Sequence, residues 1–123
     1  MATASARKLW RVLDRFETKP WSWTKHHWFR YERGRGNVNC LAGRLMGVRS
    51  NAMVDHGAIN ADPECLLVAE IIKEQFPDRL RSSHRLYPSS IIPTFNDHPN
   101  TTLEDVQLVL RKAAIQCDEV LGA

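Results

Sequence analysis

One short segment, residues 96–99, gathers side chains that could bind a metal ion or transfer protons. It reads Asn96, Asp97, His98 and Pro99, which places an amide, a carboxylate and an imidazole side by side. Such groups act as ligands or as acid–base pairs in functional sites. Asn and Asp side chains also hydrogen-bond nearby backbone amides and so fix turns. We therefore interpret Asn96, Asp97 and His98 first as a turn leading into the next helix, and second as a functional turn.

Cys40 stands where a helix is predicted to begin, a position that could make it a nucleophile. Helix N-termini stabilise a thiolate and lower the pKa of the thiol. A cysteine-dependent hydrolase or transferase would also need an imidazole base, oriented by Asp55 or Asp97. Because free cysteine is among the most buried residue types, we favour a core role for Cys40. The histidines available as a base are His26, His27, His56, His84 and His98.

The sequence predicts no metal ion, no cofactor and no disulfide framework. His26 and His27 are adjacent, so their side chains diverge on a strand or helix and cannot readily share one ion. Cys40, Cys65 and Cys117 form an odd set without CxxC spacing, which favours neither a zinc site nor disulfides. A reducing cytoplasm is the expected location.

The stretch from residue 19 to residue 35 mixes cations with aromatic rings. Cations neutralise phosphates while aromatic faces stack on unpaired bases, so the mixture suits nucleic acid. It suits a protein partner equally, because Trp, Tyr and Arg dominate interface hot spots. The tryptophans could instead pack under the helices, with the charges as a solvated rim. The candidate binding residues are Trp21, Trp23, Lys25, Trp28, Arg30, Tyr31, Arg33 and Arg35.

Composition and charge limit the classes of protein to which this chain can belong. The chain has 123 residues, 43% hydrophobic and 25% charged, which favours one packed domain over a disordered chain. Residues 1–49 hold 11 Lys/Arg against 3 Asp/Glu, a net +8, whereas residues 50–123 hold 6 against 11, a net −5. The basic half could therefore face an acidic partner. Without an apolar run of roughly 18 to 20 residues or a leader pattern, we expect neither membrane insertion nor export.

Apolar periodicity and capping signals predict the elements that position these residues. Helices are expected at 6–18, 38–47, 62–76 and 101–121. A short strand is expected at 28–31, and 49–61 is predicted to be a loop. The segment 79–100, with prolines at 88, 93 and 99, is predicted to be a long connection with brief extended pieces at 90–92 or 94–95. We expect a mainly α fold, with α+β as the alternative: a compact four-helix single domain over 1–123 with one or two short extended segments, packed mainly through the third and fourth helices.

Three landmarks resemble a family of uncharacterised small proteins from actinobacteria and their phages. They are the Trp-rich stretch after the first helix, the segment Cys40-Leu41-Ala42-Gly43, and Phe95-Asn96-Asp97-His98-Pro99 leading into Thr102-Leu103-Glu104-Asp105-Val106. In that family an alanine usually follows the glycine, where this chain has Arg44, and a basic stretch like 30–35 is not typical. The resemblance implies a cytoplasmic bacterial or phage-encoded accessory protein and no established activity.

We expect a small, cytoplasmic, non-enzymatic interaction module that binds a partner protein, a host protein if the chain is phage-encoded. Nucleic-acid binding through residues 19–35 is the second hypothesis, and an enzyme centred on Cys40 is the third. No membrane partner is expected.

Overall fold

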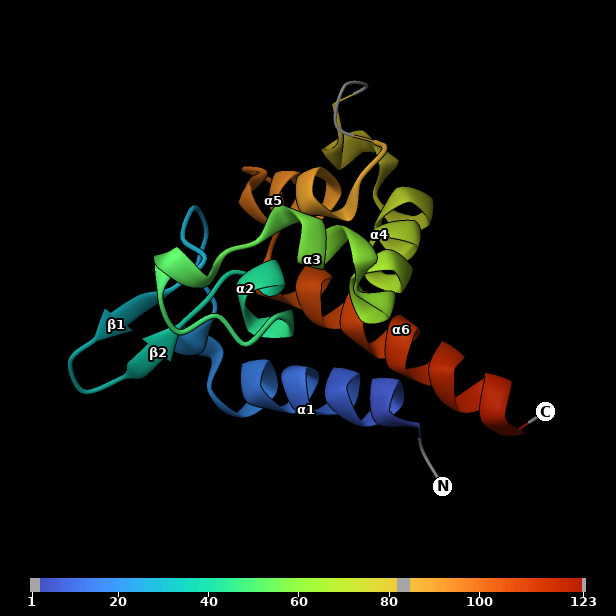
Figure 1. Ribbon diagram of the computed structural model, residues 1–123, viewed down its shortest axis with the longest axis horizontal. Coiled ribbons are helices and arrows are strands. Elements are labelled where there is room, and N and C mark those ends of the chain that lie inside the picture. The colour runs from blue at the N-terminus through green and yellow to red at the C-terminus, as the bar shows by residue number, and fades with distance from the viewer. Residues whose placement is uncertain (1–2, 82–84, 123) are drawn as a thin grey trace.

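Helices form most of the structure, a computed structural model that describes residues 3–81 and 85–122. A two-stranded sheet stands at one side of the helical body (Figure 1). The fold is therefore mainly α with a small β contribution, as predicted. No helix in the described ranges is long and apolar enough to cross a membrane. The elements are α1 (Ala4–Thr18), β1 (Arg30–Glu32), β2 (Gly36–Val38), α2 (Leu41–Leu45), α3 (His56–Ala61), α4 (Pro63–Gln75), α5 (Pro88–Asp97) and α6 (Leu103–Gly122).

Local capping explains where the long helices begin, and these boundaries agree with the prediction. Asp62 accepts from the backbone N–H of Cys65 at 2.9 Å, and Pro63 occupies the first turn of α4. At α6, Thr102 and Asp105 form a reciprocal capping box, with N–H to side-chain oxygen distances of 3.1 and 3.2 Å. These side chains satisfy backbone donors that have no partner within the helix.

The core lies where α1, α4 and α6 meet. The prediction placed the main packing between α4 and α6; these helices do contact, and α1 also packs along α6 (Figure 1). Leu9, Leu13 and Phe16 of α1 are buried at this contact. Trp10 closes one end, because its indole N–H donates to the Asp118 carboxylate at 2.8 Å. The first and last helices therefore hold each other in place.

The prediction of a long connection over 79–100 was wrong, because residues 88–97 form α5 with Pro93 inside it. Pro88 suits the first turn of a helix, where its missing N–H is not needed. Pro93 removes one helical hydrogen bond, a cost that tertiary packing offsets here. Ile91, Ile92 and Phe95 are all buried on the core side of α5. Packing thus overrides the local signal of the prolines.

The loop predicted at 49–61 also contains a helix, α3. Asp55 caps it by accepting from the Ala58 N–H at 3.1 Å, and Ile59 is its one buried residue. A single apolar anchor gives no detectable period, so the sequence did not indicate this helix. The second predicted helix is shorter than expected, because β2 occupies 36–38 and α2 begins only at Leu41.

β1 and β2 form an antiparallel hairpin in which Tyr31 pairs with Asn37. The strand predicted at 28–31 is thus present but lies slightly later in the chain. Gly34 and Gly36 have φ values of 84° and 81°, a left-handed conformation that glycine adopts without strain. The hairpin extends sideways from the helical body, away from α4 and α6 (Figure 1).

Candidate functional site

Asn96, in the last turn of α5, connects three segments of the chain. Its side chain is fully buried. The carboxamide oxygen accepts from the indole N–H of Trp23 at 2.6 Å and from the backbone N–H of Leu41 at 3.0 Å. Its amide nitrogen donates to the Thr24 carbonyl and to the Asp97 carboxylate, both at 3.0 Å. A buried amide with its donors and acceptor satisfied fixes these segments relative to one another.

The residues beside Asn96 anchor the Trp-rich loop in the same region. Asp97 Oδ1 accepts from the backbone N–H of His26 at 2.7 Å, and Oδ2 lies 3.6 Å from the His26 Nδ1. His26 has φ 67°, a left-handed conformation that costs a non-glycine residue roughly 1–2 kcal/mol. Lys25 Nζ donates to the carbonyl of His98 at 2.6 Å. The predicted functional turn is therefore the C-terminal end of α5, and its contacts hold a strained loop.

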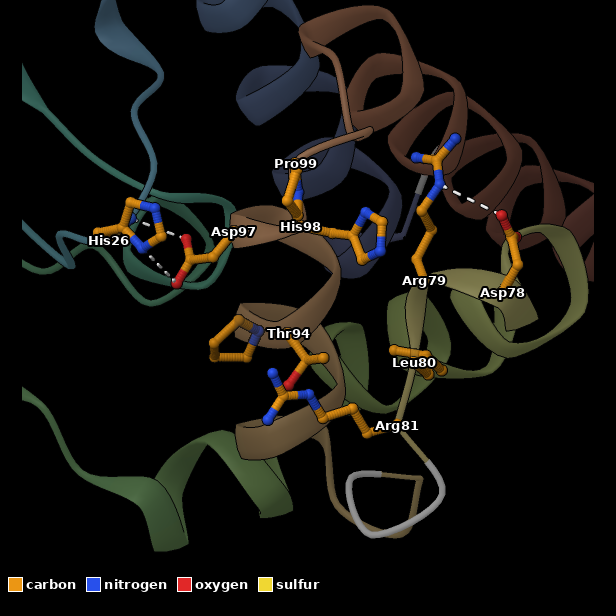
Figure 2. Close-up of a pocket in the computed structure, with 10 residues that line it drawn as sticks. His26, Asp78, Arg79, Leu80, Arg81, Thr94, Asp97, His98 and Pro99 are labelled. Carbon is orange, nitrogen blue, oxygen red and sulfur yellow. Dashed lines mark hydrogen bonds and ion pairs between the residues drawn. The ribbon is translucent and has the colours of Figure 1, made fainter.

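A cleft of about 500 Å³ opens beside this junction. Figure 2 shows His26 and Asp97 on the left of it, Arg79 on the right and His98 between them, with Arg81 below. The cleft thus combines two imidazoles, two carboxylates and two guanidinium groups. Asp97 lies beside the His26 imidazole without a hydrogen bond to the ring, because its bond to His26 is made to the backbone N–H.

The cleft holds no activated nucleophile among its described lining residues. Thr94 carries the only hydroxyl there, and no hydrogen bond joins it to an imidazole. Arg79 is occupied by the start of α6, since its Nη1 donates to the Thr101 hydroxyl at 3.0 Å and to Asp105 at 2.9 Å. Across the described residues, no three His, Cys, Asp or Glu side chains could hold a metal ion together. The imidazoles and carboxylates of this cleft are groups that can transfer protons.

Cys40 caps α2. Its sulfur accepts from the Gly43 backbone N–H at 3.3 Å, and the side chain is buried. Burial raises the pKa of the Cys40 thiol to about 11, which the hydrogen bond from Gly43 only partly offsets, and the charge of Asp97 raises it further. The helix terminus was expected to lower this pKa, but burial outweighs it. No imidazole of the described residues hydrogen-bonds the thiol, and His84 lies outside them.

We predict that Cys40 resists alkylation in the native protein. A pKa of about 11 leaves roughly 100-fold less thiolate at neutral pH than an ordinary cysteine has, and burial restricts access further. Iodoacetamide labelling at pH 7, followed by peptide mass spectrometry, should modify the less buried Cys117 first and Cys40 only after denaturation. Rapid native labelling of Cys40 would contradict this and would favour the nucleophile hypothesis.

Gly43 lets the Trp-rich loop lie directly on α2. A Cβ atom at this position would lie 2.1 Å from the carbonyl oxygen of Trp28, well inside van der Waals contact. The same carbonyl accepts from the side-chain amide of Asn39 at 2.7 Å, and that amide also donates to the Val48 carbonyl at 2.9 Å. The backbone of Trp28 is therefore fixed from two sides.

The predicted binding residues divide into two groups. Trp23, Lys25 and Trp28 are partly buried and hold the loop in place through the contacts above. The remaining five are exposed. Trp21 lies in a short helical turn, Pro20–Ser22, and the other four lie on the hairpin: Arg30, Tyr31, Arg33 and Arg35. The structure therefore separates a supporting set from a set that is free to meet a partner.

The exposed set is basic and aromatic. Tyr31 is 66% exposed and Trp21 is 45% exposed. Arg30 and Arg35 both form ion pairs with Glu32, and such exposed pairs are weak. Because these pairs are easily exchanged, the hairpin arginines remain available to another anion.

Arg15 and Arg44 form a second cationic group that sequence reasoning missed. The Nη2 atoms of both approach the carbonyl of Asn37, at 3.5 and 3.1 Å. The available signal was the spacing of Arg11 and Arg15 on the polar face of α1. Their convergence with Arg44 depends on how α1 and α2 pack, which no local pattern indicates.

One family model matches most of the chain. It is described as a family of unknown function, DUF6197, and it covers residues 2–116. The chain belongs to the DUF6197 family. No curated protein and no solved structure matches it. Membership confirms the expected relation to a family of unknown function and assigns no activity.

Two of the landmark segments of this DUF6197 chain meet at one junction. Residues 40–43 begin α2, and residues 95–99 end α5, joined through the hydrogen bond from Leu41 to Asn96. Their polar and small residues satisfy buried backbone groups or permit close packing. These two segments of the resemblance therefore have a structural role at this junction.

Proposed function

We propose that this DUF6197 protein is a non-enzymatic interaction module that binds an acidic partner protein through the β1–β2 hairpin. The observation that carries the proposal is an exposed basic-aromatic hairpin on a firmly held base. Trp23 and Trp28 hold that base through Asn96 and Asn39. A rigid base lowers the entropy lost when the hairpin binds.

The residue types of the hairpin face support a protein partner. Tyrosine, tryptophan and arginine supply most of the energy of protein interfaces. Tyr31 and Trp21 offer exposed rings, and Arg33 at the hairpin tip has no ion pair among the described residues. An acidic surface on the partner would complement these charges and speed association.

The chemistry of the interior favours binding over catalysis. Cys40 is a buried cap, and the cleft beside Asp97 lacks an activated nucleophile among the described residues. Nucleic acid remains the alternative ligand of the hairpin face, because stacking on Tyr31 and phosphate contacts would use the same residues. Binding of a protein partner and binding of nucleic acid differ in their response to nuclease and to salt.

The family resemblance supplies the setting in which we propose to look for the partner. It implies an actinobacterial or phage origin and action in the cytoplasm, so the natural source of partners is an actinobacterial lysate. A host protein is the proposed partner if the chain is phage-encoded.

The test is capture of the partner by a charge-matched pair of variants. Arg33→Gln/Arg35→Gln and Lys73→Gln/Lys112→Gln each remove two positive charges, the first pair from the hairpin and the second from α4 and α6. We expect the hairpin variant to weaken retention of an acidic protein by about 10-fold or more, with the control unchanged. The bait is photo-crosslinked at Tyr31 in lysate with and without nuclease treatment, and the crosslinked peptide is identified by mass spectrometry.

A crosslink at Tyr31 that survives nuclease and is reduced only by the hairpin variant would support the proposal. Capture of nucleic acid alone, lost after nuclease, would replace it with the alternative. Equal capture by both variants would overturn the hairpin as the contact surface.

A further inference from the structure

A basic groove of about 500 Å³ lies between α1 and the end of α2, on residues that the proposed hairpin interface does not use. Its rim carries cations from both helices, and its apolar lining includes Val12, Leu45 and Met46. The volume falls within the range of roughly 300–1,000 Å³ typical of small-molecule sites. The cations that line it are Lys8, Arg11, Arg15 and Arg44.

The arginines of this groove have no internal counterion. Lys8 is paired with Asp62 at 3.3 Å and with Glu64 at 3.6 Å. In the part of the chain that the structure describes, no carboxylate lies within ion-pair distance of Arg11, Arg15 or Arg44. The positive charge of the groove is therefore left uncompensated by the fold.

Arg15 and Arg44 converge on one point although they repel each other. Both direct Nη2 to the carbonyl of Asn37, and the Nε–H of each is buried without an acceptor among the described residues. Burial lowers the pKa of Arg44, and the charges of Arg15 and Arg49 lower it further. Two guanidinium groups held together in this way, without an anion, are destabilising. A bound anion would relieve that repulsion.

We propose that this groove binds the phosphate group of a small phosphorylated molecule. A phosphate monoester carries up to two charges and enough oxygens to accept from the forks of both Arg15 and Arg44 at once. A carboxylate has only two oxygens and one charge, so it would satisfy one arginine. The apolar side chains Val12, Leu45 and Met46 would contact the organic part of the ligand.

Calorimetric titration of the full chain with inorganic phosphate and with a nucleoside monophosphate, at constant ionic strength, tests the assignment. Wild type should bind both, the monophosphate more tightly because of its organic part. Arg44→Gln should weaken binding by about 30-fold or more, since it removes one of two partly buried charged donors. Arg15→Lys keeps the charge without the planar fork and should give an intermediate loss. Lys112→Gln, on α6 and outside both the groove and the hairpin, should bind like wild type.

Circular dichroism without phosphate checks that each variant is folded, and Arg15→Lys keeps the test decisive if Arg44→Gln does not fold. Absence of binding to wild type, or equal binding by wild type and both groove variants, would overturn the site. Binding of a short single-stranded oligonucleotide with none of either phosphate probe would overturn the small-molecule assignment. Because the groove and the hairpin share no lining residue, failure of the hairpin proposal would not affect this result.

Discussion

Replacing Asn96 by alanine is expected to lower the free energy of unfolding by about 3–5 kcal/mol, a large part of the stability of a domain of this size. The substitution removes four hydrogen bonds at once. It leaves the backbone N–H of Leu41, the indole N–H of Trp23 and the carbonyl of Thr24 without this partner. Urea denaturation followed by tryptophan fluorescence and by circular dichroism measures the loss.

Asn100→Ala is the matched control for this measurement. Asn100 is an exposed asparagine a few residues later, and its side chain makes no hydrogen bond in the described structure. Its substitution should change stability by less than about 0.5 kcal/mol. A loss below about 1 kcal/mol for Asn96→Ala would show that Asn96 does not hold the junction together.

Replacing Gly43 by alanine is the second change with a large expected effect. Alanine normally stabilises a helix relative to glycine by up to about 1 kcal/mol. Here the added Cβ would lie 2.1 Å from the carbonyl oxygen and 2.9 Å from the carbonyl carbon of Trp28. Both are backbone atoms, held by Asn39, so no side chain can rotate away. We therefore expect alanine to destabilise the protein instead. The free energy of unfolding should fall by about 3 kcal/mol or more in the same urea assay.

Gly57→Ala in α3 provides the comparison for Gly43→Ala. At Gly57 a Cβ atom would meet only the side-chain oxygen of Asp55, at 3.3 Å. A side chain can shift by a few tenths of an ångström, so the change should stay within about 1 kcal/mol. If both variants were as stable as wild type, the loop would have to lie further from α2 than described.

The sequence was informative where local signals decide the structure. The α4 and α6 boundaries depend on Asp62 and on the Thr102–Asp105 pair, whose side chains act within one turn. The spacing of the apolar residues in α1 likewise indicates directly which face of the helix is buried. The mainly helical fold could therefore be predicted from the composition, from the helix-capping residues and from the period of the apolar residues.

The sequence was uninformative where contacts between distant residues decide the structure. Pro93 is a residue type that disfavours the interior of a helix. Only the burial of Ile92 and Phe95 against the core makes a helix favourable there. Asn96 was recognised as a turn residue, but its partners Trp23 and Leu41 lie 73 and 55 residues away in the sequence. The convergence of Arg15 with Arg44 has the same origin, so the groove could not be found from either helix alone.

The pairing of α1 with α6 has a consequence for how the chain acquires its structure during synthesis. The contact from Trp10 to Asp118 joins residues 108 positions apart. The side chain of Gln107 donates to the carbonyl of Phe16, which lies 91 positions earlier in the chain. The apolar face of α1 therefore has no complete cover until α6 has left the ribosome. The nascent chain must carry that exposed face while the roughly hundred residues between the two helices are synthesised, and α6 then closes the domain in one late, long-range step.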